Sequence, residues 1–273
     1  MIKNKIFLIA EIGWNHLGDM KLAEKMIKSA KENGADFCKF QTWSVKNLIT
    51  GPWDKDGRKQ IYEKAQLTRY KHEKLIQLCK KYKVHFLTSI FNINDINYLK
   101  KINKRIIKIP SHEIYNIPLI KKCLEKFDKV LISTGASKWK EVLSITKLKY
   151  FKKKAVLMHC VSSYPCDDKN MNMLRINDLK KLTSQIGYSG HANHINDAIL
   201  SITMGASYIE KHFTINKKLP GRDNRNAIMP HELKIISNFR EKIMPMRIYR
   251  GKDLQECEFD IYKNYRGRWS GEQ

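Results

Sequence analysis

The sequence predicts an α/β fold, a single (β/α)8 TIM barrel with a short C-terminal extension. Eight short apolar runs of strand type alternate with amphipathic stretches of helical type. In a chain of 273 residues this fits a closed barrel, whose usual size is about 250 residues. An open doubly wound sheet is the competing arrangement, but it should carry a G-x-G-x-x-G turn after the first strand. Residues 13–18 lack that spacing, which favours the barrel.

The elements are expected in strict alternation along the chain. The expected strands cover residues 6–12, 37–41, 84–89, 106–109, 130–133, 155–160, 186–188 and 208–210. The expected helices cover residues 21–33, 70–82, 94–101, 117–127, 138–148, 173–183, 192–205 and 230–242. The first helix shows the pattern clearly, because Met20, Ala23, Met26, Ile27 and Ala30 are spaced to form one buried face.

Three long loops, at residues 43–68, 162–172 and 216–229, each follow a strand. They should therefore lie on the carboxyl face of the barrel, where barrel enzymes carry their chemistry. The regular alternation ends after the last helix. We expect the barrel to span residues 1–243 and a basic tail to span residues 244–273.

Composition is that of a globular protein, with 42% hydrophobic and 29% charged residues. No apolar run approaches the roughly 20 residues of a membrane helix. The N-terminal apolar run is too short for a signal peptide and meets Glu11 without a small-residue cleavage site. These features predict a cytoplasmic protein without membrane insertion. The six cysteines are scattered and are expected to be reduced thiols.

A formal net charge of +25 raises the possibility of a nucleic-acid partner. However, 41 of the 52 basic residues are lysines, and most lie on helical stretches such as residues 71–83 and 147–154. No stripe of arginines and aromatic residues accompanies them. We therefore expect solvated helix faces and no specific nucleic acid; the other interpretation of the charge is attraction of anionic substrates.

Two histidines, His191 and His212, come directly after short apolar runs. Since the carboxyl ends of parallel strands meet at one edge, both imidazoles should emerge there, where they could hold one divalent metal. The alternative is that each imidazole is satisfied by a backbone carbonyl. The other histidines near helices, His72, His85, His194 and His231, are expected at the surface.

Two lysines, Lys39 and Lys108, stand inside apolar runs. A buried lysine is costly unless it is paired or faces a polar cavity. With hydroxyls from neighbouring strand ends, the two lysines would suit an anion such as a phosphate or carboxylate. The simpler interpretations are that Lys39 only pairs with Glu11, and that residues 133–135 are only a turn.

Eight stretches, taken in order, resemble one known family. They are AEIGWNHLGD at 10–19, GADFCKFQ at 34–41, KIPSHEIYN at 108–116, STG at 133–135, HCVSSYP at 159–165, GYSGH at 187–191, EKHFT at 210–214 and PGRD at 220–223. The family is that of the sialic acid synthases, the N-acetylneuraminate synthase type that also includes legionaminate and pseudaminate synthases. The resemblance covers about residues 5–240.

The resemblance implies a barrel that condenses phosphoenolpyruvate with an N-acetylated hexosamine, similar to N-acetylmannosamine. The products would be a nine-carbon 2-keto sugar acid and phosphate. It also implies a divalent cofactor, Mn²⁺ first and Mg²⁺ or Co²⁺ as alternatives, with His191 and His212 as its ligands. The residues expected to bind substrate are Lys39, Gln41, Ser89, Ser111, Ser133, Ser162 and Ser189, and the catalytic ones are Glu11, Lys108, Glu113, Tyr164 and Asp223.

The chain departs from the family pattern at three positions. Leu17 replaces a polar residue, Ile90 replaces the proline of a Ser-Thr-Pro-Phe pattern, and Gly190 replaces the aspartate of a Ser-Asp-His pattern. The loss of that aspartate is expected to loosen the support of His191.

The small C-terminal antifreeze-like domain of the family is not expected here. In the family it reaches across a homodimer to the partner's sugar site, so its absence leaves the acceptor open although a homodimer is still expected. Two alternatives therefore stand beside the main interpretation: a phosphoenolpyruvate-dependent synthase acting on a different aldose, and a non-catalytic barrel that binds an anionic partner.

Overall fold

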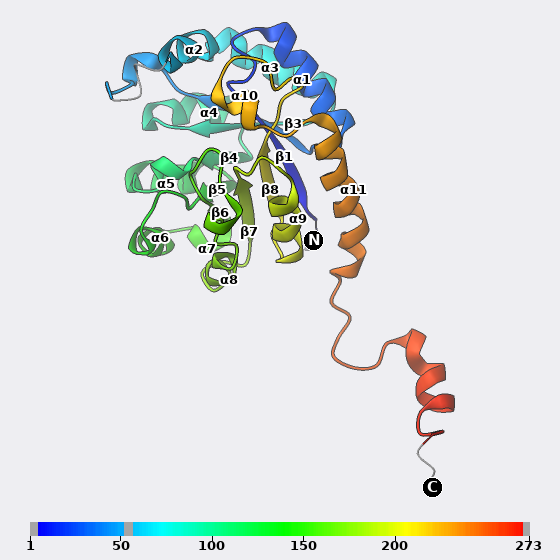
Figure 1. Ribbon diagram of the computed structural model, residues 1–273. Coiled ribbons are helices and arrows are strands. Elements are labelled where there is room, and N and C mark those ends of the chain that lie inside the picture. The colour runs from blue at the N-terminus through cyan, green and yellow to red at the C-terminus, as the bar shows by residue number, and fades with distance from the viewer. Residues whose placement is uncertain (1–4, 52–56, 270–273) are drawn as a thin grey trace.

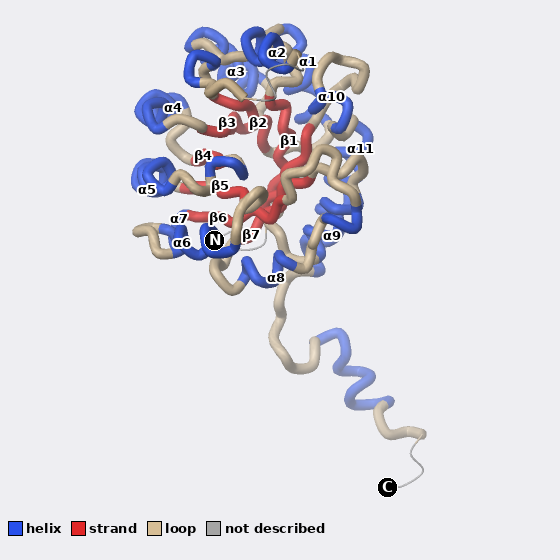
Figure 2. The backbone as a smooth tube through the Cα atoms, turned by 60° about the vertical axis from the view of Figure 1, so that its left-hand side comes forward, coloured by secondary structure: helices blue, strands red, loops and turns tan. Residues whose placement is uncertain are grey.

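A computed structural model describes residues 5–51 and 57–269 and confirms a closed barrel of eight parallel strands paired in chain order. Viewed in Figure 2, the strands form an inner ring and the helices surround it. The strands are β1 (Phe7–Gly13), β2 (Phe37–Thr42), β3 (His85–Ile90), β4 (Ile106–Ile109), β5 (Lys129–Ser133), β6 (Ala155–Cys160), β7 (Ile186–Gly190) and β8 (Tyr208–His212).

The expected helices are all present, with shifted ends. They are α1 (Met20–Glu32), α3 (Arg69–Lys81), α4 (Ile96–Ile102), α5 (Ile117–Lys126), α6 (Trp139–Thr146), α8 (Arg175–Lys180), α9 (Asn196–Thr203) and α11 (Pro230–Met246). The structure adds α7 (Phe151–Lys154), and it places α2 (Arg58–Ala65) and α10 (Arg222–Asn226) in two segments expected to be loops. Helix α9 begins four residues later than expected. The carbonyls of Ala192 and His194, in the turn before it, accept hydrogen bonds from Lys211 Nζ.

Side-chain caps explain where several helices begin. The Asp19 carboxylate accepts hydrogen bonds from two backbone N–H groups of the first turn of α1, those of Lys21 and Leu22. Thr68 caps α3 and Asn116 caps α5 in the same way. Each cap is worth about 1 kcal/mol, because it satisfies N–H groups that have no partner inside the helix.

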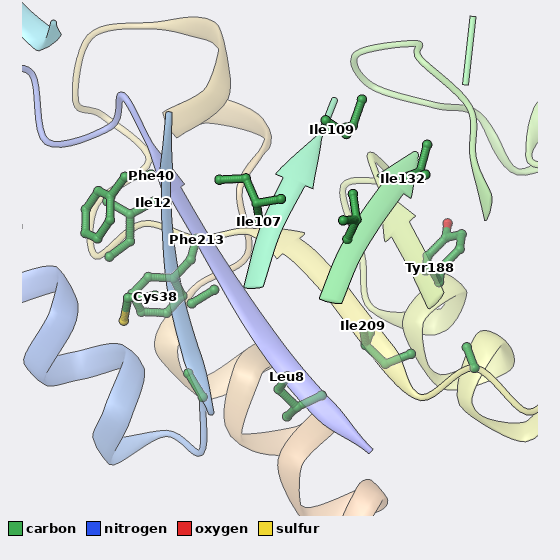
Figure 3. Close-up of a cluster of buried hydrophobic side chains, with 14 of the residues drawn as sticks. Leu8, Ile12, Cys38, Phe40, Ile107, Ile109, Ile132, Tyr188, Ile209 and Phe213 are labelled. Carbon is green, nitrogen blue, oxygen red and sulfur yellow. The ribbon is translucent and has the colours of Figure 1, made fainter. Parts of the chain in front are cut away.

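Alternate residues of each strand face two separate cores. Outward side chains pack against the helices, and Figure 3 shows part of this cluster, including Leu8, Phe40 and Ile209. Inward side chains fill the barrel itself with Ile9, Phe37, Leu87, Ile106, Leu131, Val156, Met158 and Tyr208. Towards the carboxyl ends of the strands the inward positions become polar, and the candidate site lies there.

The tail leads away from the barrel. Helix α11 continues to Met246, and the described residues after it extend outward in Figure 1 with short helical turns at Glu256–Glu258 and Ile261–Tyr265. Large apolar side chains are exposed along it, including Tyr249, Phe259 and Trp269.

All six cysteines are free thiols, as expected, and only Cys257 is exposed. Within residues 5–51 and 57–269 no helix has the length and apolar character needed to cross a bilayer. His85 and His231 are exposed as expected, and His194 is partly exposed. The expectation for His72 was wrong: it is buried, because the inner side of α3 packs on the barrel.

Candidate active site

Each strand carries a polar inward side chain near its carboxyl end. These side chains are Glu11, Lys39, Ser89, Lys108, Ser133, Cys160, Ser189 and Glu210, one from each of β1 to β8 in turn. The strand register places Glu11 opposite Lys39, Ser89 opposite Lys108, Cys160 opposite Ser189, and Ser189 opposite Glu210, and the other neighbouring pairs are offset by two residues. The closed barrel therefore gathers residues from all eight strands in one buried polar layer.

Two lysines and two carboxylates form the charged centre of this layer. Lys39 Nζ lies 2.9 Å from Glu11 Oε2, 3.5 Å from Glu210 Oε1 and 3.0 Å from Ser89 Oγ. Lys108 Nζ lies 3.1 Å from Glu210 Oε1. All four charged side chains are at most 7% exposed. Lys39 therefore both pairs with Glu11 and faces a polar interior.

Each of the two carboxylates also accepts a hydrogen bond from a neutral side chain. Ser189 Oγ donates to Glu210 at 3.0 Å, and Gln41 Nε2 donates to Glu11 Oε1 at 2.7 Å. Ser133 Oγ is different, since it is buried and has no hydrogen-bond partner among the residues that the structure describes. An unsatisfied buried hydroxyl is costly, which makes Ser133 a natural contact for a bound ligand.

The two carboxylates have opposite protonation behaviour. Burial raises the pKa of Glu11 to about 7, against the opposing effect of Lys39. Burial acts in the same direction on Glu210, but Lys108 and Lys39 outweigh it and lower the pKa of Glu210 to about 2. Burial tends to lower the pKa of both lysines; Glu11 and Glu210 reverse this for Lys39, whose pKa is raised, whereas that of Lys108 is lowered. Glu11 is thus the group suited to exchanging a proton near neutral pH.

Buried ion pairs of this kind stabilise a fold poorly, because desolvation offsets much of the attraction between the charges. Apolar side chains of similar size would fill the barrel at least as well. A layer with two lysines and two carboxylates therefore points to a binding or catalytic task rather than to packing.

The two histidines lie side by side above this layer. His191 follows β7 and His212 ends β8, and their ring centroids are 5.6 Å apart. His191 Nδ1 lies 2.7 Å from the Val161 carbonyl oxygen and donates a hydrogen bond to it, so in the neutral imidazole Nε2 carries the lone pair. His212 Nδ1 is buried, and no described residue hydrogen bonds to it. Burial lowers the pKa of His212 to about 4.

Neutral imidazoles with free lone pairs are the form that binds metal ions. With metal–nitrogen bonds of about 2.1 Å, one ion could reach both rings at their observed spacing. Among the described residues no group of three or more His, Cys, Asp and Glu side chains is arranged to hold a metal. The pair thus fits an ion that would keep several positions open for water or substrate.

Cys160 is a site residue that the sequence analysis did not assign. Its Sγ lies 3.3 Å from Ser111 Oγ and 3.8 Å from His191 Nδ1. Burial would raise the pKa of the Cys160 thiol. The charge of His191 and the hydrogen bonds that the thiol makes with His191 and Ser111 outweigh burial and lower this pKa to about 7. A methyl group added at Gly135 would come within 2.5 Å of Ser162 Oγ and 2.8 Å of Ser111 Oγ, so the turn after β5 lies directly against both serines.

Residues of the β6 and β8 loops form the outer wall beside the histidines. The Tyr164 ring lies 4.0 Å from the His191 ring, and Arg222 stacks over Tyr164 at 4.5 Å. Asp223 Oδ2 lies 3.7 Å from His212 Nδ1 and accepts a hydrogen bond from Trp14 Nε1. These four groups from three loops surround the histidine pair.

Glu113 is the predicted residue that is not part of either cluster. It lies on the turn after β4, where its carboxylate accepts a hydrogen bond from Asn116 Nδ2 at 3.0 Å. Burial raises its pKa, although the Asn116 hydrogen bond opposes this.

Glu210, Trp14 and Arg222 were also given no role from sequence. For Glu210 a signal existed: Tyr208, Glu210 and His212 alternate along one strand, so a predicted inward His212 implies an inward Glu210. Trp14 lies in the turn after β1, and Arg222 begins the short helix α10 in a segment expected to be a loop, so no such periodicity identifies them.

Comparisons with known proteins identify the family of this chain. The model of the NeuB family matches residues 26–247. The N,N'-diacetyllegionaminic acid synthase of Campylobacter jejuni is 34% identical over 248 residues, which is 85% of this chain and 74% of that protein. The N-acetylneuraminate-9-phosphate synthase of Drosophila melanogaster is 33% identical, over 89% of this chain and 70% of the fly protein.

Among solved structures, the N-acetylneuraminic acid synthetase of Leptospira borgpetersenii in complex with citrate is similar along almost the whole chain. The TM-score is 0.85 at 29% sequence identity, and the match covers 99% of this chain and 94% of the other.

Proposed function

Since this chain belongs to the NeuB family, we propose that it condenses phosphoenolpyruvate with an N-acetylated hexosamine to give a nine-carbon 2-keto sugar acid and phosphate. The relatives are named as synthases of legionaminic, pseudaminic and sialic acids, and the chain is accordingly an enzyme of the condensing transferase type.

The observation that carries the proposal is the buried pair Lys39 and Lys108 directly below the two histidines. Phosphoenolpyruvate has two anionic groups, a phosphate and a carboxylate, and each could take one ammonium group as a partner. Ser89 and Ser189 already hydrogen bond within this layer, and the Ser133 hydroxyl there has no hydrogen-bond partner in the described part of the chain. We assign the phosphoenolpyruvate subsite to this layer, with Gln41, Ser111 and Ser162 at its edge.

In the proposed reaction a bond forms between the methylene carbon of phosphoenolpyruvate and the aldehyde carbon of the sugar. Water cleaves the phosphate ester of phosphoenolpyruvate and phosphate leaves, so that the enol carbon becomes the keto carbon and the aldehyde oxygen, after taking up a proton, becomes a hydroxyl group. Lys39 and Lys108 neutralise the phosphate, and Lys108 stabilises charge that develops at the reacting carbons. Glu11, with a pKa of about 7, exchanges a proton.

The acceptor is assigned to the space beside the histidines, which Tyr164 and Asp223 border. Glu113 would orient the sugar or a water molecule from the β4 side. A divalent ion held by His191 and His212, for which we propose Mn²⁺ with Mg²⁺ or Co²⁺ as alternatives, would polarise the aldehyde oxygen as a Lewis acid.

A phosphate-release assay tests the proposal. Phosphoenolpyruvate and Mn²⁺ are supplied with a panel of aldoses that differ in chain length and N-acylation, and products are identified by mass. We expect release only with N-acetylated hexosamines, loss of release with a chelator, and recovery when Mn²⁺ is returned. If phosphate is released only with aldoses that lack an N-acyl group, the acceptor is such an aldose and not an N-acetylated hexosamine. If no aldose gives phosphate release, the proposed condensing activity is wrong.

We also propose that the enzyme works as a cytoplasmic homodimer, as the family resemblance implies. The exposed apolar side chains of the tail, Tyr249, Phe259 and Trp269 among them, support an assembled state. Light scattering of the purified chain tests the dimer: the mass should be twice the 32.1 kDa of one chain.

A further inference from the structure

A buried ion pair lies on the outer side of β7 and β8, behind the strands that carry the two histidines. Lys211 Nζ lies 2.8 Å from Asp197 Oδ2 and 3.1 Å from Asp197 Oδ1, and the pair is almost fully buried. Asp197 belongs to α9, and its Oδ2 also accepts a hydrogen bond from Tyr188 at 2.9 Å. None of these three side chains belongs to the polar layer inside the barrel.

The same ammonium group ties together the two segments that hold the histidines. Lys211 immediately precedes His212 on β8. Its Nζ donates to the carbonyl oxygens of Ala192 and His194, both at 3.0 Å, and Ala192 immediately follows His191. A movement of Lys211 would therefore shift the backbone next to His191 as well as the backbone next to His212.

Gly190 faces the same cluster. It lies opposite Lys211 in the strand register, and a Cβ placed on it would be 2.3 Å from Asp197 Oδ2 and 2.5 Å from Tyr188 Cε1. The carboxylate of Asp197 thus occupies the space that a side chain at position 190 would need. In its observed conformation Asp197 therefore leaves no room for an aspartate at position 190.

We propose that Asp197 is the positioning carboxylate of the histidine pair, and that it does from α9 what the aspartate of the Ser-Asp-His pattern would do from β7. Gly190 is then required for Asp197 to reach Lys211, and the support of His191 is moved rather than lost. The part of this inference that concerns metal binding rests on the proposed function. The structural part does not: Lys211 can be paired with a carboxylate at position 197 or with one at position 190, and we call this alternative the exchange of carboxylates.

Melting temperatures of four proteins test the exchange: the wild type, Gly190→Asp, Asp197→Ala and Gly190→Asp/Asp197→Ala. Breaking a buried pair should make Asp197→Ala melt roughly 10 °C lower. Gly190→Asp alone should also melt lower, because its Cβ meets the Asp197 carboxylate. In the Asp197→Ala background the same change should raise the melting temperature, since Tyr188 is freed from Asp197 and the new carboxylate can reach Lys211. A Gly190→Asp change that destabilises both backgrounds would overturn the exchange.

Calorimetric titration with Mn²⁺ tests the positioning role separately from activity. We expect Asp197→Ala and the isosteric Asp197→Asn to bind Mn²⁺ about 10- to 100-fold more weakly, and the double variant to recover most of the loss. Asp178→Asn, which breaks the exposed pair with Lys181, is the matched control and should leave the affinity unchanged. Wild-type affinity in both Asp197 variants would overturn the positioning role. If the wild type itself does not bind Mn²⁺, the proposed metal chemistry fails, and the melting temperatures alone decide whether the carboxylates exchange.

Discussion

Both carboxylate oxygens of Glu210 accept hydrogen bonds from Lys108 Nζ inside the barrel, at 3.1 and 3.2 Å. Lys39 is paired with two carboxylates, Glu11 and Glu210. Among the described residues, Lys108 is paired with Glu210 alone. The charge of Lys108 in the ligand-free protein therefore depends on Glu210.

Glu210→Gln should destabilise the fold strongly. The amide preserves the size of the side chain but leaves Lys108 buried without a counter-charge, which costs about 3–5 kcal/mol. Urea unfolding measures this loss. Asp178→Asn removes the carboxylate of an exposed pair, so it should cost less than about 1 kcal/mol. A Glu210→Gln protein as stable as this control would show that Lys108 does not need its partner.

His212→Ala should remove most of the metal affinity, because it deletes one of the two imidazoles that face each other at 5.6 Å. We expect Mn²⁺ binding to weaken by about 100-fold or more, beyond the usual effect of changing a residue that only supports a ligand. Calorimetry measures the affinity. His194→Ala is the matched control, since His194 pairs with Asp168 at a partly exposed position. Equal Mn²⁺ affinity in the two variants would argue against the histidine site.

Gly135→Ala should weaken phosphoenolpyruvate binding. The added methyl group would lie 2.5 Å from Ser162 Oγ and 2.8 Å from Ser111 Oγ, so both hydroxyls must move. Loss of about one hydrogen bond should raise the KM for phosphoenolpyruvate roughly tenfold and change the KM for the sugar less. Gly51→Ala is the control, because an added Cβ there lies more than 4 Å from the other residues that the structure describes, its two chain neighbours aside. A larger effect on the sugar KM would place these serines on the acceptor side.

The barrel was predictable because strand and helix periodicity are local properties of the chain. The positions of Lys39 and Lys108 followed from the same periodicity, since a charged residue inside a strand must face the barrel or pair with another charge. The Lys211–Asp197 pair could not be predicted in this way. It depends on where α9 begins, and that depends in turn on the carbonyls that Lys211 itself engages.

His72, on helix α3, shows the same limit of prediction from sequence. It was expected at the surface, but its Nε2 lies 2.9 Å from Thr42 Oγ1 and its Nδ1 lies 3.1 Å from the Thr68 carbonyl oxygen. Thr42 comes from β2, which is 30 residues away in sequence. Helical periodicity shows that a position faces the barrel, but it does not show that a polar side chain of another element lies there as a hydrogen-bond partner.

The burial of His72 predicts that the folded protein becomes less stable as the pH falls. Burial lowers the pKa of His72 to about 4 from its usual 6.5, so the folded protein resists protonation that the unfolded chain accepts. The stability that His72 contributes is complete above pH 6.5 and is lost as the pH falls towards 4. For these two pKa values the loss between pH 7 and pH 5 is about 2 kcal/mol.

Urea unfolding of wild type and His72→Gln at pH 7 and pH 5 measures this contribution. The variant should be less stable at pH 7, because the hydrogen bonds to Thr42 and Thr68 are disturbed, but it should lose about 2 kcal/mol less on acidification. Other buried histidines, His16 and His159, have pKa values lowered to about 4 and keep their own pH dependence in both proteins. His85→Gln at an exposed position should follow the wild type. If His72→Gln and wild type lose equal stability between the two pH values, the imidazole of His72 is not held neutral by burial.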